Sequence, residues 1–490
     1  MTSLETLNSA RVFYYFTEIC KIPHISYHEK ALSDYCVRFA EAHNLVYEQD
    51  HMGNLLIIKE AIAGYENEPA VMIQGHLDMV GDKLPSLNID LEKEAVTLRK
   101  EGDFIYANGT TLGGDNGVAV AYALAILESD TIAHPRLEVV LTVCEEVGLL
   151  GASAMDLSSC QARKLINVDS EIEGILTAGC AGGRRALCHI PLERISCDNA
   201  NNDKLLYSLT LTGLLGGHSG TEINKGRANA NTLMGRILLY LNNQLPYGLL
   251  SLDGGVKENV IPNTASAQII VEKETCSVLE TCLNRLQKIF SDEYAGSDPD
   301  VRIEATHESM DISANPLQAL TDDSLHKVIT ALILAPCGVQ SMSADLPELV
   351  ETSLNLGVIT MTDHELQLRF SLRSSVTTAK EFLSDKIAHL ASYLGGTTEF
   401  AGDYPAWSYN RISPLRDICS KIYEEMYGEK PQIDIIHAGL ECGILSSKIE
   451  GLDCISFGPN LYDIHSPNEH MSISSVDRVW DYLLRVLAAK

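Results

Sequence analysis

The sequence predicts an α/β protein with a mostly parallel sheet flanked by helices, into which a large α+β segment is inserted. In residues 1–185, apolar strand patterns alternate with helical patterns, an order typical of parallel sheets. In residues 186–402, strands alternate apolar and polar side chains, which is typical of sheets with one buried face. The α/β pattern returns in residues 403–490, so we expect the first domain to be built from both ends of the chain.

The individual elements of the first segment follow from the spacing of apolar residues. Apolar residues recur at helical spacing from Val12 to Cys20 and from Leu32 to Phe39, and Pro23 is expected to close the first helix. A third helix, rich in small residues that permit close packing on a sheet, follows Asp115. Buried strands are expected at residues 54–59, 70–74, 137–144 and 164–168.

The insertion and the last segment are assigned in the same way. Half-buried strands are expected at residues 207–211 and 366–372, with helices near 228–243, 277–293, 323–335 and 379–394. Residues 453–457 form an expected strand of the last segment. The final helix is expected at 474–488, because Ser474–Asp477 is a typical helix-capping start.

Composition excludes several classes of function. The 490 residues suggest two or three domains, and 37 basic against 66 acidic residues give a formal net charge of −29. Such acidity disfavours nucleic acid and anionic membranes as partners. The start of the chain shows no secretory signal, and no apolar run is long enough to span a membrane. The 13 cysteines form no Cys-x-x-Cys pair, which favours reduced thiols and a cytoplasmic location.

Five short stretches with histidine or acidic residues lie at the ends of expected strands or in nearby loops. They are residues 75–78, 114–117, 144–148, 168–171 and 463–466. In an open α/β sheet, ligands bind at the carboxyl edge of the strands. Together the stretches supply two imidazoles and several carboxylates, the mixed N/O set that suits Zn²⁺. The sequence therefore predicts a site for two zinc ions.

The first two stretches each have a plain alternative. His76 and Asp78 are two apart in extended chain and share one face, so His76 could bind metal while Asp78 fixes its second nitrogen. The alternative is a core histidine beside a turn aspartate. Asp115 could bridge two cations held about 3.5–4 Å apart. Its alternative is the capping of the helix that follows.

The other three stretches also leave alternatives open. Glu145 and Glu146 would repel each other at a buried strand end unless a cation lay near, so one could bind metal and the other accept a proton from water. The alternative is a pair of solvated loop acids. Asp169 is a candidate ligand or a strand-end cap. His465 is a candidate ligand or a surface-loop histidine, with His470 as a rival.

These stretches, in this order, resemble the zinc-dependent aminoacylase, carboxypeptidase and dipeptidase superfamily, and above all its aminoacyl-histidine dipeptidase branch. Residues 107–117 and 437–443 carry the same resemblance, which covers essentially the whole chain. One departure is Cys144, where the wider superfamily often has Asp. The resemblance implies a zinc-exopeptidase-like fold, and it implies that the insertion is a lid and dimerisation domain. A cytoplasmic homodimer is therefore expected.

The resemblance also implies roles for the residues of the first domain. Asp115 would bridge two zinc ions per subunit, and the peptide bond after it is often cis in such enzymes. His76 and Asp169 would complete one ion, and Glu146 and His465 the other. Glu145 would be the general acid/base and Asp78 the partner of His76. Co²⁺ or Mn²⁺ could replace zinc at an N/O site.

In the insertion, the resemblance implies substrate contacts. His218, between glycines, would polarise the scissile carbonyl, although it could be an exposed turn histidine. Arg373 could hold the free carboxylate of a dipeptide or lie on a solvated strand face. Asn263 would offer an amide, with an ordinary turn as its alternative, and Gly439, at the expected opening of a helix, would offer a backbone N–H.

The function that the resemblance implies is hydrolysis of dipeptides, with Xaa-His dipeptides such as β-alanyl-histidine preferred. That preference comes from the resemblance alone, because the sequence contains no motif that recognises imidazole. A tripeptidase or an N-acyl-amino-acid deacylase could use the same two-metal site. A non-catalytic peptide-binding protein on the same fold is the alternative from a different class.

Overall fold

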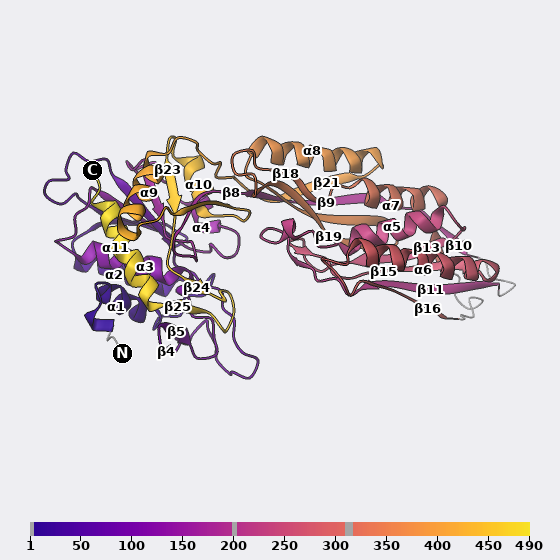
Figure 1. The fold of residues 1–490 in the computed structure, drawn as a ribbon, viewed down its shortest axis with the longest axis horizontal. Coiled ribbons are helices and arrows are strands. Elements are labelled where there is room, and N and C mark those ends of the chain that lie inside the picture. Colours follow the sequence, from indigo (N-terminus) through magenta and orange to yellow (C-terminus); the bar gives the residue numbers. More distant parts are fainter. Residues whose placement is uncertain (1–3, 198–202, 309–316) are drawn as a thin grey trace. The chain divides into compact units, whose positions relative to one another are not determined.

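The computed structural model describes residues 4–197, 203–308 and 317–490, which form two compact units (Figure 1). Unit 1 comprises residues 1–180, 407–436 and 440–490, and unit 2 comprises residues 181–406 and 437–439. The boundaries expected from the sequence, 185/186 and 402/403, lie a few residues from those in the structure, 180/181 and 406/407. Residues 437–439, expected in the last segment, belong to unit 2.

Unit 1 is built on an eight-stranded sheet. Its strands in spatial order are β1 (Val46–Gln49), β2 (Leu55–Lys59), β6 (Leu137–Thr142), β3 (Val71–His76), β7 (Lys164–Asn167), β23 (Asp453–Ser456), β8 (Ile175–Cys180) and β22 (Gln432–Ile436). The four neighbours β6, β3, β7 and β23 are parallel, as are β8 and β22. The remaining neighbours pair antiparallel. The expected α/β class with a mostly parallel sheet is confirmed.

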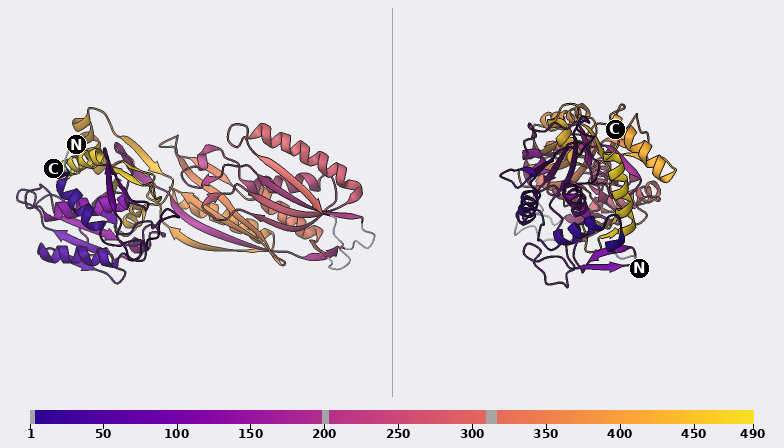
Figure 2. Two further views of the ribbon diagram at one scale, coloured as in Figure 1. Left: turned by 90° about the horizontal axis from the view of Figure 1, so that it is seen from below. Right: turned by 90° about the vertical axis from the view of Figure 1, so that its left-hand side faces the viewer.

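Helices cover this sheet because its central strands are apolar on both faces. Every residue of β3 and β6 is buried. The helices are α1 (Ala10–Ile19), α2 (Lys30–Ala42), α3 (Gly114–Glu128), α4 (Leu150–Ala154), α9 (Pro414–Tyr427), α10 (Glu441–Lys448) and α11 (Ile473–Leu487). Helix α3 is buried along nearly all its length and packs against α1 and β3, as its small residues predict. The first and last helices of the chain thus lie in the same unit (Figure 2).

A smaller sheet completes unit 1. It contains β24 (Leu461–Tyr462), β25 (His470–Ser472), β5 (Phe104–Ala107) and β4 (Leu98–Glu101) in that order. Strand β25 pairs with β5, so the loop between β24 and β25 is tied at both ends to a short, defined piece of sheet. This loop contains His465.

Two expected helix ends differ from those observed. Helix α1 ends at Ile19, because hydrogen bonds from Cys20 and Lys21 tighten the chain into a turn before Pro23 is reached. Helix α11 begins at Ile473, earlier than expected, because the hydroxyl of Ser472 accepts the N–H of Ser475 and caps the helix. The hydroxyl of Ser474 instead donates to Asp103.

Unit 2 is an antiparallel sheet covered by helices, as expected for the insertion. Its main strands in order are β16 (Arg302–Glu308), β11 (Lys204–Thr212), β15 (Ala265–Glu272), β13 (Gly248–Gly254), β19 (Val350–Met361), β20 (Glu365–Ser374), β9 (Gly182–Pro191) and β21 (Thr397–Tyr404), and β18 (Gly338–Met342) pairs with β19. Its helices are α5 (Ala230–Asn242), α6 (Cys276–Glu293), α7 (Asp322–Leu334) and α8 (Thr377–Tyr393). Two short pairs, β10 (Arg194–Cys197) with β17 (Leu317–Leu320) and β12 (Gly217–His218) with β14 (Val260–Ile261), complete it.

The capping of α11 gives a first testable expectation. Ser472→Ala removes the cap and a hydrogen bond to Asp103, whereas Ser474→Ala removes a hydrogen bond to the same carboxylate and keeps the cap. Both variants lose the hydrogen bond between the two hydroxyls. We expect Ser472→Ala to lower the free energy of unfolding by about 1 kcal/mol more than Ser474→Ala. Urea unfolding followed by circular dichroism measures the difference, and equal midpoints for the two variants would contradict the assigned cap.

Candidate metal centre

The parallel strands of unit 1 bring the candidate ligands to one edge of the sheet. His76 is the last residue of β3, and Glu146 and Asp169 follow β6 and β7. Asp115 lies in the first turn of α3, and His465 in the loop between β24 and β25. The side chains of Asp169 and Glu146 are each 8% exposed, and that of His76 is 2% exposed. Five residues from distant parts of the sequence therefore surround one small region.

The two carboxylate oxygens of Asp115 face different imidazoles. Oδ1 lies 3.2 Å from Nε2 of His76, and Oδ2 lies 3.2 Å from Nε2 of His465. The first imidazole nitrogen is also 3.5 Å from Oδ1 of Asp169, and the second is 3.0 Å from Oε1 of Glu146. The donor atoms thus form two groups that share Asp115. The peptide bond after Asp115 is cis, as the resemblance implies.

His465, rather than His470, reaches this cluster. The ring of His470 is stacked between the rings of Tyr106 and Tyr462, with centroids 4.7 and 4.9 Å away. Its Nδ1 lies 2.9 Å from the backbone carbonyl of Asn468. His470 therefore serves the packing of the small sheet.

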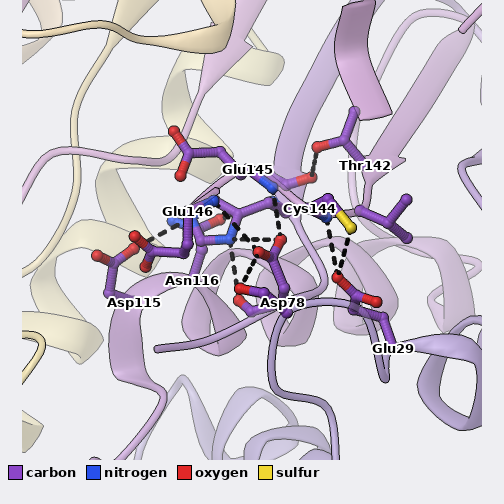
Figure 3. Close-up of polar contacts among 12 residues, drawn as sticks. Glu29, Asp78, Asp115, Asn116, Thr142, Cys144, Glu145 and Glu146 are labelled. Carbon is purple, nitrogen blue, oxygen red and sulfur yellow. Dashed lines mark hydrogen bonds and ion pairs between the residues drawn. The ribbon is translucent and has the colours of Figure 1, made fainter. Parts of the chain in front are cut away.

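Asp78 holds the backbone of the Glu145–Glu146 pair. Its Oδ1 accepts the N–H of Glu145 at 2.9 Å and its Oδ2 accepts that of Glu146 at 3.2 Å (Figure 3). The closest acceptor for Nδ1 of His76 is the backbone carbonyl of Asp78, at 3.0 Å, with the carboxylate at 3.5 Å. Asp78 thus orients His76 mainly through its backbone, while its side chain fixes the acidic pair.

Asn116 and Glu29 hold segments around the candidate ligands in place. Neither residue was identified from the sequence. The side chain of Asn116 accepts the N–H of His76 at 3.2 Å and donates to Oδ1 of Asp169 at 2.9 Å. Glu29 accepts both the N–H and the thiol of Cys144, at 2.9 and 3.3 Å (Figure 3). Cys144 has a φ of +53°, so this contact holds a turn that an L-residue rarely adopts immediately before Glu145.

The electrostatics of the cluster show why a cation belongs there. Burial raises the pKa of Asp169 to about 6, and burial together with Asp169, Glu441 and Glu146 raises the pKa of Glu145 well above its usual range, although His76 opposes this. Burial opposes ionisation of Asp115, but hydrogen bonds to His465 and His76 lower its pKa. Hydrogen bonds to Asp115 and Glu146 raise the pKa of His465 to about 11. The two imidazoles therefore supply positive charge among the crowded carboxylates.

The residues fit a pair of divalent cations. Imidazole nitrogens and carboxylate oxygens are the ligands of catalytic zinc sites, and one carboxylate with an oxygen toward each group can bridge two ions. His76, Asp115 and Glu146 offer donor atoms that all lie within 4.8 Å of one another. Within the described residues, the Glu145 carboxylate makes no hydrogen bond or ion pair, so it stays free to exchange protons.

The four candidate substrate residues lie in unit 2, and His218 and Arg373 lie close to each other. A Cβ on Gly220 would lie 2.9 Å from Cε1 of His218 and 3.1 Å from Cζ of Arg373. Nη1 of Arg373 is 3.5 Å from the carbonyl of His437, two residues before Gly439. Asn263 is exposed and follows β14, the partner strand of β12, which carries His218. Gly439 precedes α10 but does not open it, because the helix begins at Glu441.

Two buried glutamates of unit 1 were also missed by sequence reasoning. Glu441, fully buried, accepts from Thr142 at 2.6 Å and from Gln74, and burial raises its pKa to about 8. Glu469 accepts four backbone N–H groups around Asp115. Burial raises its pKa to about 7, although these donors oppose the shift. Neither glutamate stands out in the sequence, because its hydrogen-bond partners lie on distant segments.

Comparison with known proteins agrees with this geometry. The model of peptidase family M20/M25/M40 matches residues 72–489. The chain is 37% identical over 99% of its length, and 99% of the relative's, to the cytosol non-specific dipeptidase of Escherichia coli K12. The chain therefore belongs to peptidase family M20/M25/M40, a family of metallopeptidases, and the family expected from the motifs is confirmed.

Solved structures give the same result. The aminoacylhistidine dipeptidase of Vibrio alginolyticus is 34% identical and superposes with a TM-score of 0.91, covering 99% of this chain and 98% of that one. The aminopeptidase PepT of Bacillus cereus is 13% identical with a TM-score of 0.55, with 98% of each chain covered, and shares the fold. Among the residues that the structure describes, no helix is both long and apolar enough to cross a membrane.

The shared position of Asp115 can be tested by metal analysis. Asp115→Asn should lose at least half of the bound metal, because an amide cannot supply two anionic oxygens to two cations. Asp463→Asn is the matched control: it removes a 65% exposed carboxylate from the loop of His465, and asparagine tolerates its φ of +50°. Elemental analysis after dialysis gives the metal per chain. A full complement in Asp115→Asn would rule out the bridging position.

Proposed function

We propose that this protein is a dipeptidase whose site holds two divalent metal ions, with zinc as the resident metal. The observation that carries the proposal is the division of the Asp115 carboxylate between two imidazoles, each with a further carboxylate beside it. Membership of a metallopeptidase family and the dipeptidase names of both well-matched relatives support it. His76 and Asp169 would hold one ion, Glu146 and His465 the other, and Asp115 both.

Glu145 is the proposed general acid/base. When bound, the two ions would supply an acidified water and a Lewis acid for the scissile carbonyl. Glu145 would take the proton from that water and pass it to the leaving amine. Its backbone is fixed by Asp78, its carboxylate makes no hydrogen bond within the described residues, and its raised pKa suits a group that must carry a proton for part of the cycle.

Arg373 is the proposed anchor for the free carboxylate of the substrate. Its side chain is buried, its Nε has no hydrogen-bond partner, and no acidic side chain of the described ranges forms an ion pair with it. A buried guanidinium without an anion favours an anionic ligand, and a carboxylate can accept two of its N–H groups. The backbone N–H of Gly439 and the amide of Asn263 are proposed as further contacts. Such a requirement for a free carboxylate would make the enzyme an exopeptidase.

His218 is proposed to polarise the scissile carbonyl as a neutral imidazole. Burial and the nearby Arg373 guanidinium lower the pKa of His218, which keeps its ring neutral at pH 7. A neutral ring carries one N–H, the donor that a developing oxyanion requires.

The base assignment predicts a loss of turnover without a loss of metal. Glu145→Gln should retain its bound metal and lower kcat by about 10²- to 10⁴-fold, because the amide cannot accept the proton. Steady-state kinetics on a dipeptide and elemental analysis of the same sample measure both quantities. An active Glu145→Gln enzyme would refute the assignment, and loss of metal would make Glu145 a ligand.

The role of His218 predicts a similar separation. His218→Ala should lower kcat by about 10²-fold or more with unchanged metal content, because an oxyanion donor is removed. His389→Ala, which removes an exposed histidine from α8 of the same unit, is the control and should behave as the parent chain. An unchanged rate in His218→Ala would remove this residue from the mechanism.

Substrate preference is the most direct test of the proposed activity. We expect cleavage of β-alanyl-histidine, Gly-His and Ala-Leu, abolished by a chelator, with Xaa-His dipeptides cleaved fastest. The two relatives differ on this point, since one is named a non-specific dipeptidase and the other an aminoacylhistidine dipeptidase. Equal rates across dipeptides would leave the dipeptidase and remove the histidine preference. Cleavage of Ala-Ala-Ala or an N-acetyl amino acid instead would indicate a tripeptidase or a deacylase, and no cleavage at all a binding protein.

We also propose a cytoplasmic homodimer. All 13 cysteines are free, which suits a reducing compartment, and one relative is named a cytosol enzyme. The dimer rests on the resemblance of the insertion to dimerisation domains. Light scattering coupled to size-exclusion chromatography distinguishes a 53.6 kDa monomer from a particle of twice that mass.

A further inference from the structure

A loop at the start of α3 folds around the carboxylate of Glu469, which is 1% exposed. Oε2 accepts the N–H groups of Leu112 and Gly113 at 2.7 and 3.0 Å. Oε1 accepts those of Gly114 and Asp115 at 2.8 and 3.2 Å. Four consecutive backbone N–H groups therefore donate to one side chain, which lies 354 residues beyond the last of them in the sequence.

This arrangement satisfies N–H groups at the start of α3, where Asp115 and Asn116 have non-helical backbone angles. The first N–H groups of a helix have no partner within the helix, and a short polar side chain at the N-cap normally satisfies one of them. Here the N-cap residue is Gly113, with a φ of +73° and no side chain to offer. Asp115, the natural candidate nearby, has both oxygens directed at His76 and His465. Glu469 satisfies the donors and so leaves the Asp115 carboxylate available to cations.

The loop has little freedom to adopt another conformation. A Cβ on Gly113 would lie 2.8 Å from Sδ of Met79, and one on Gly114 would lie 3.1 Å from Leu461 and 3.2 Å from Oε1 of Glu469. The loop is therefore pressed against the carboxylate on one side and against apolar side chains on the other. The position of the loop therefore depends on both carboxylate oxygens of Glu469 accepting its N–H groups.

Glu469 also belongs to the loop that carries His465. Its own N–H bonds to the carbonyl of Ser466, which closes a turn between the two residues, and β25 begins at the next residue, His470. One short segment thus contributes a candidate ligand and grips the backbone of the candidate bridging ligand. The separation of His465 from Asp115 is set by this segment.

We propose that Glu469 is a positioning residue that fixes the bridging carboxylate of Asp115 relative to His465, and thereby the spacing of the two metal ions. The inference rests on the proposed metal site. The four N–H groups donate to both oxygens and thereby favour the ionised carboxylate against the effect of burial, because only the ionised form accepts at both oxygens without placing a proton among these donors. Glu469 is not itself a candidate ligand, and it acts through the backbone around Asp115.

Glu469→Gln tests the proposal with the smallest change of shape. An amide offers an acceptor on one side only, so two of the four N–H groups would face another donor. We expect metal affinity, measured by competition with a chromophoric chelator, to fall by about 10- to 100-fold. The visible spectrum of the Co²⁺-loaded protein should change, and kcat should fall while KM for a dipeptide stays within about twofold.

Glu138→Gln is the matched control. Glu138 lies near the start of β6, whereas the acidic pair follows the end of this strand. It is fully buried and accepts hydrogen bonds from the backbone of Gln161 and Ala162 at 3.0 Å. Its replacement should lower the unfolding midpoint without changing metal affinity or the Co²⁺ spectrum. Equal losses of metal affinity in both variants, or none in Glu469→Gln, would overturn the positioning role. If Asp115→Asn keeps its metal, the proposed site itself fails, so the two failures are distinguishable.

A second variant covers the case in which Glu469→Gln does not fold. Glu469→Asp keeps both anionic oxygens but withdraws them by one methylene group. We expect metal affinity between those of the parent chain and of a chain without the anion, with an unfolding midpoint close to that of Glu138→Asp. Unchanged metal affinity in a folded Glu469→Asp would count against the proposal, since the loop would then not depend on where the anion lies.

Discussion

The mutual repulsion of buried acids is the constraint on which the rest of unit 1 depends. Asp115, Glu146 and Asp169 crowd around two imidazoles, and Glu145 stands beside them. Desolvation and repulsion both disfavour the ionised forms of these acids, and the imidazoles offset this only in part, since the pKa values of Glu145 and Asp169 remain raised. A divalent cation reverses the sign of that interaction. The fold must nevertheless hold the acids together while the chain is free of metal.

Backbone hydrogen bonds to buried anions do much of this holding. Asp78 fixes two consecutive N–H groups of the acidic pair, and Glu29 fixes the residue before it. Asn116 joins the end of β3 to Asp169, across a pair of neighbouring parallel strands. Each candidate ligand thus lies on a segment whose main chain is held by nearby hydrogen bonds. Side chains on such segments would stay within the small tolerances that the proposed two-metal chemistry requires.

The sequence revealed those parts of this arrangement that depend on local patterns. Apolar runs marked β3, β6 and β7, and the polar residues at their ends marked His76, Glu145 and Asp169. It could not reveal Glu469 or Asn116 as supports, because their partners lie on other segments and nothing local requires them. The cap of α11 was misplaced for a related reason. Ser472 and Ser474 look alike in sequence. In the structure both hydroxyls donate to Asp103, and the hydroxyl of Ser472 also accepts the N–H group that caps the helix.

The path of the chain has a consequence for dissecting the molecule. Residues 437–439 belong to unit 2 although the segments on either side belong to unit 1. A fragment that ends at residue 406 would therefore lack the backbone carbonyl of His437 that Arg373 contacts and the imidazole that Ser353 meets at 2.7 Å. Neither unit corresponds to one continuous stretch of gene, so domain exchange between relatives would need to transfer this tripeptide together with the insertion.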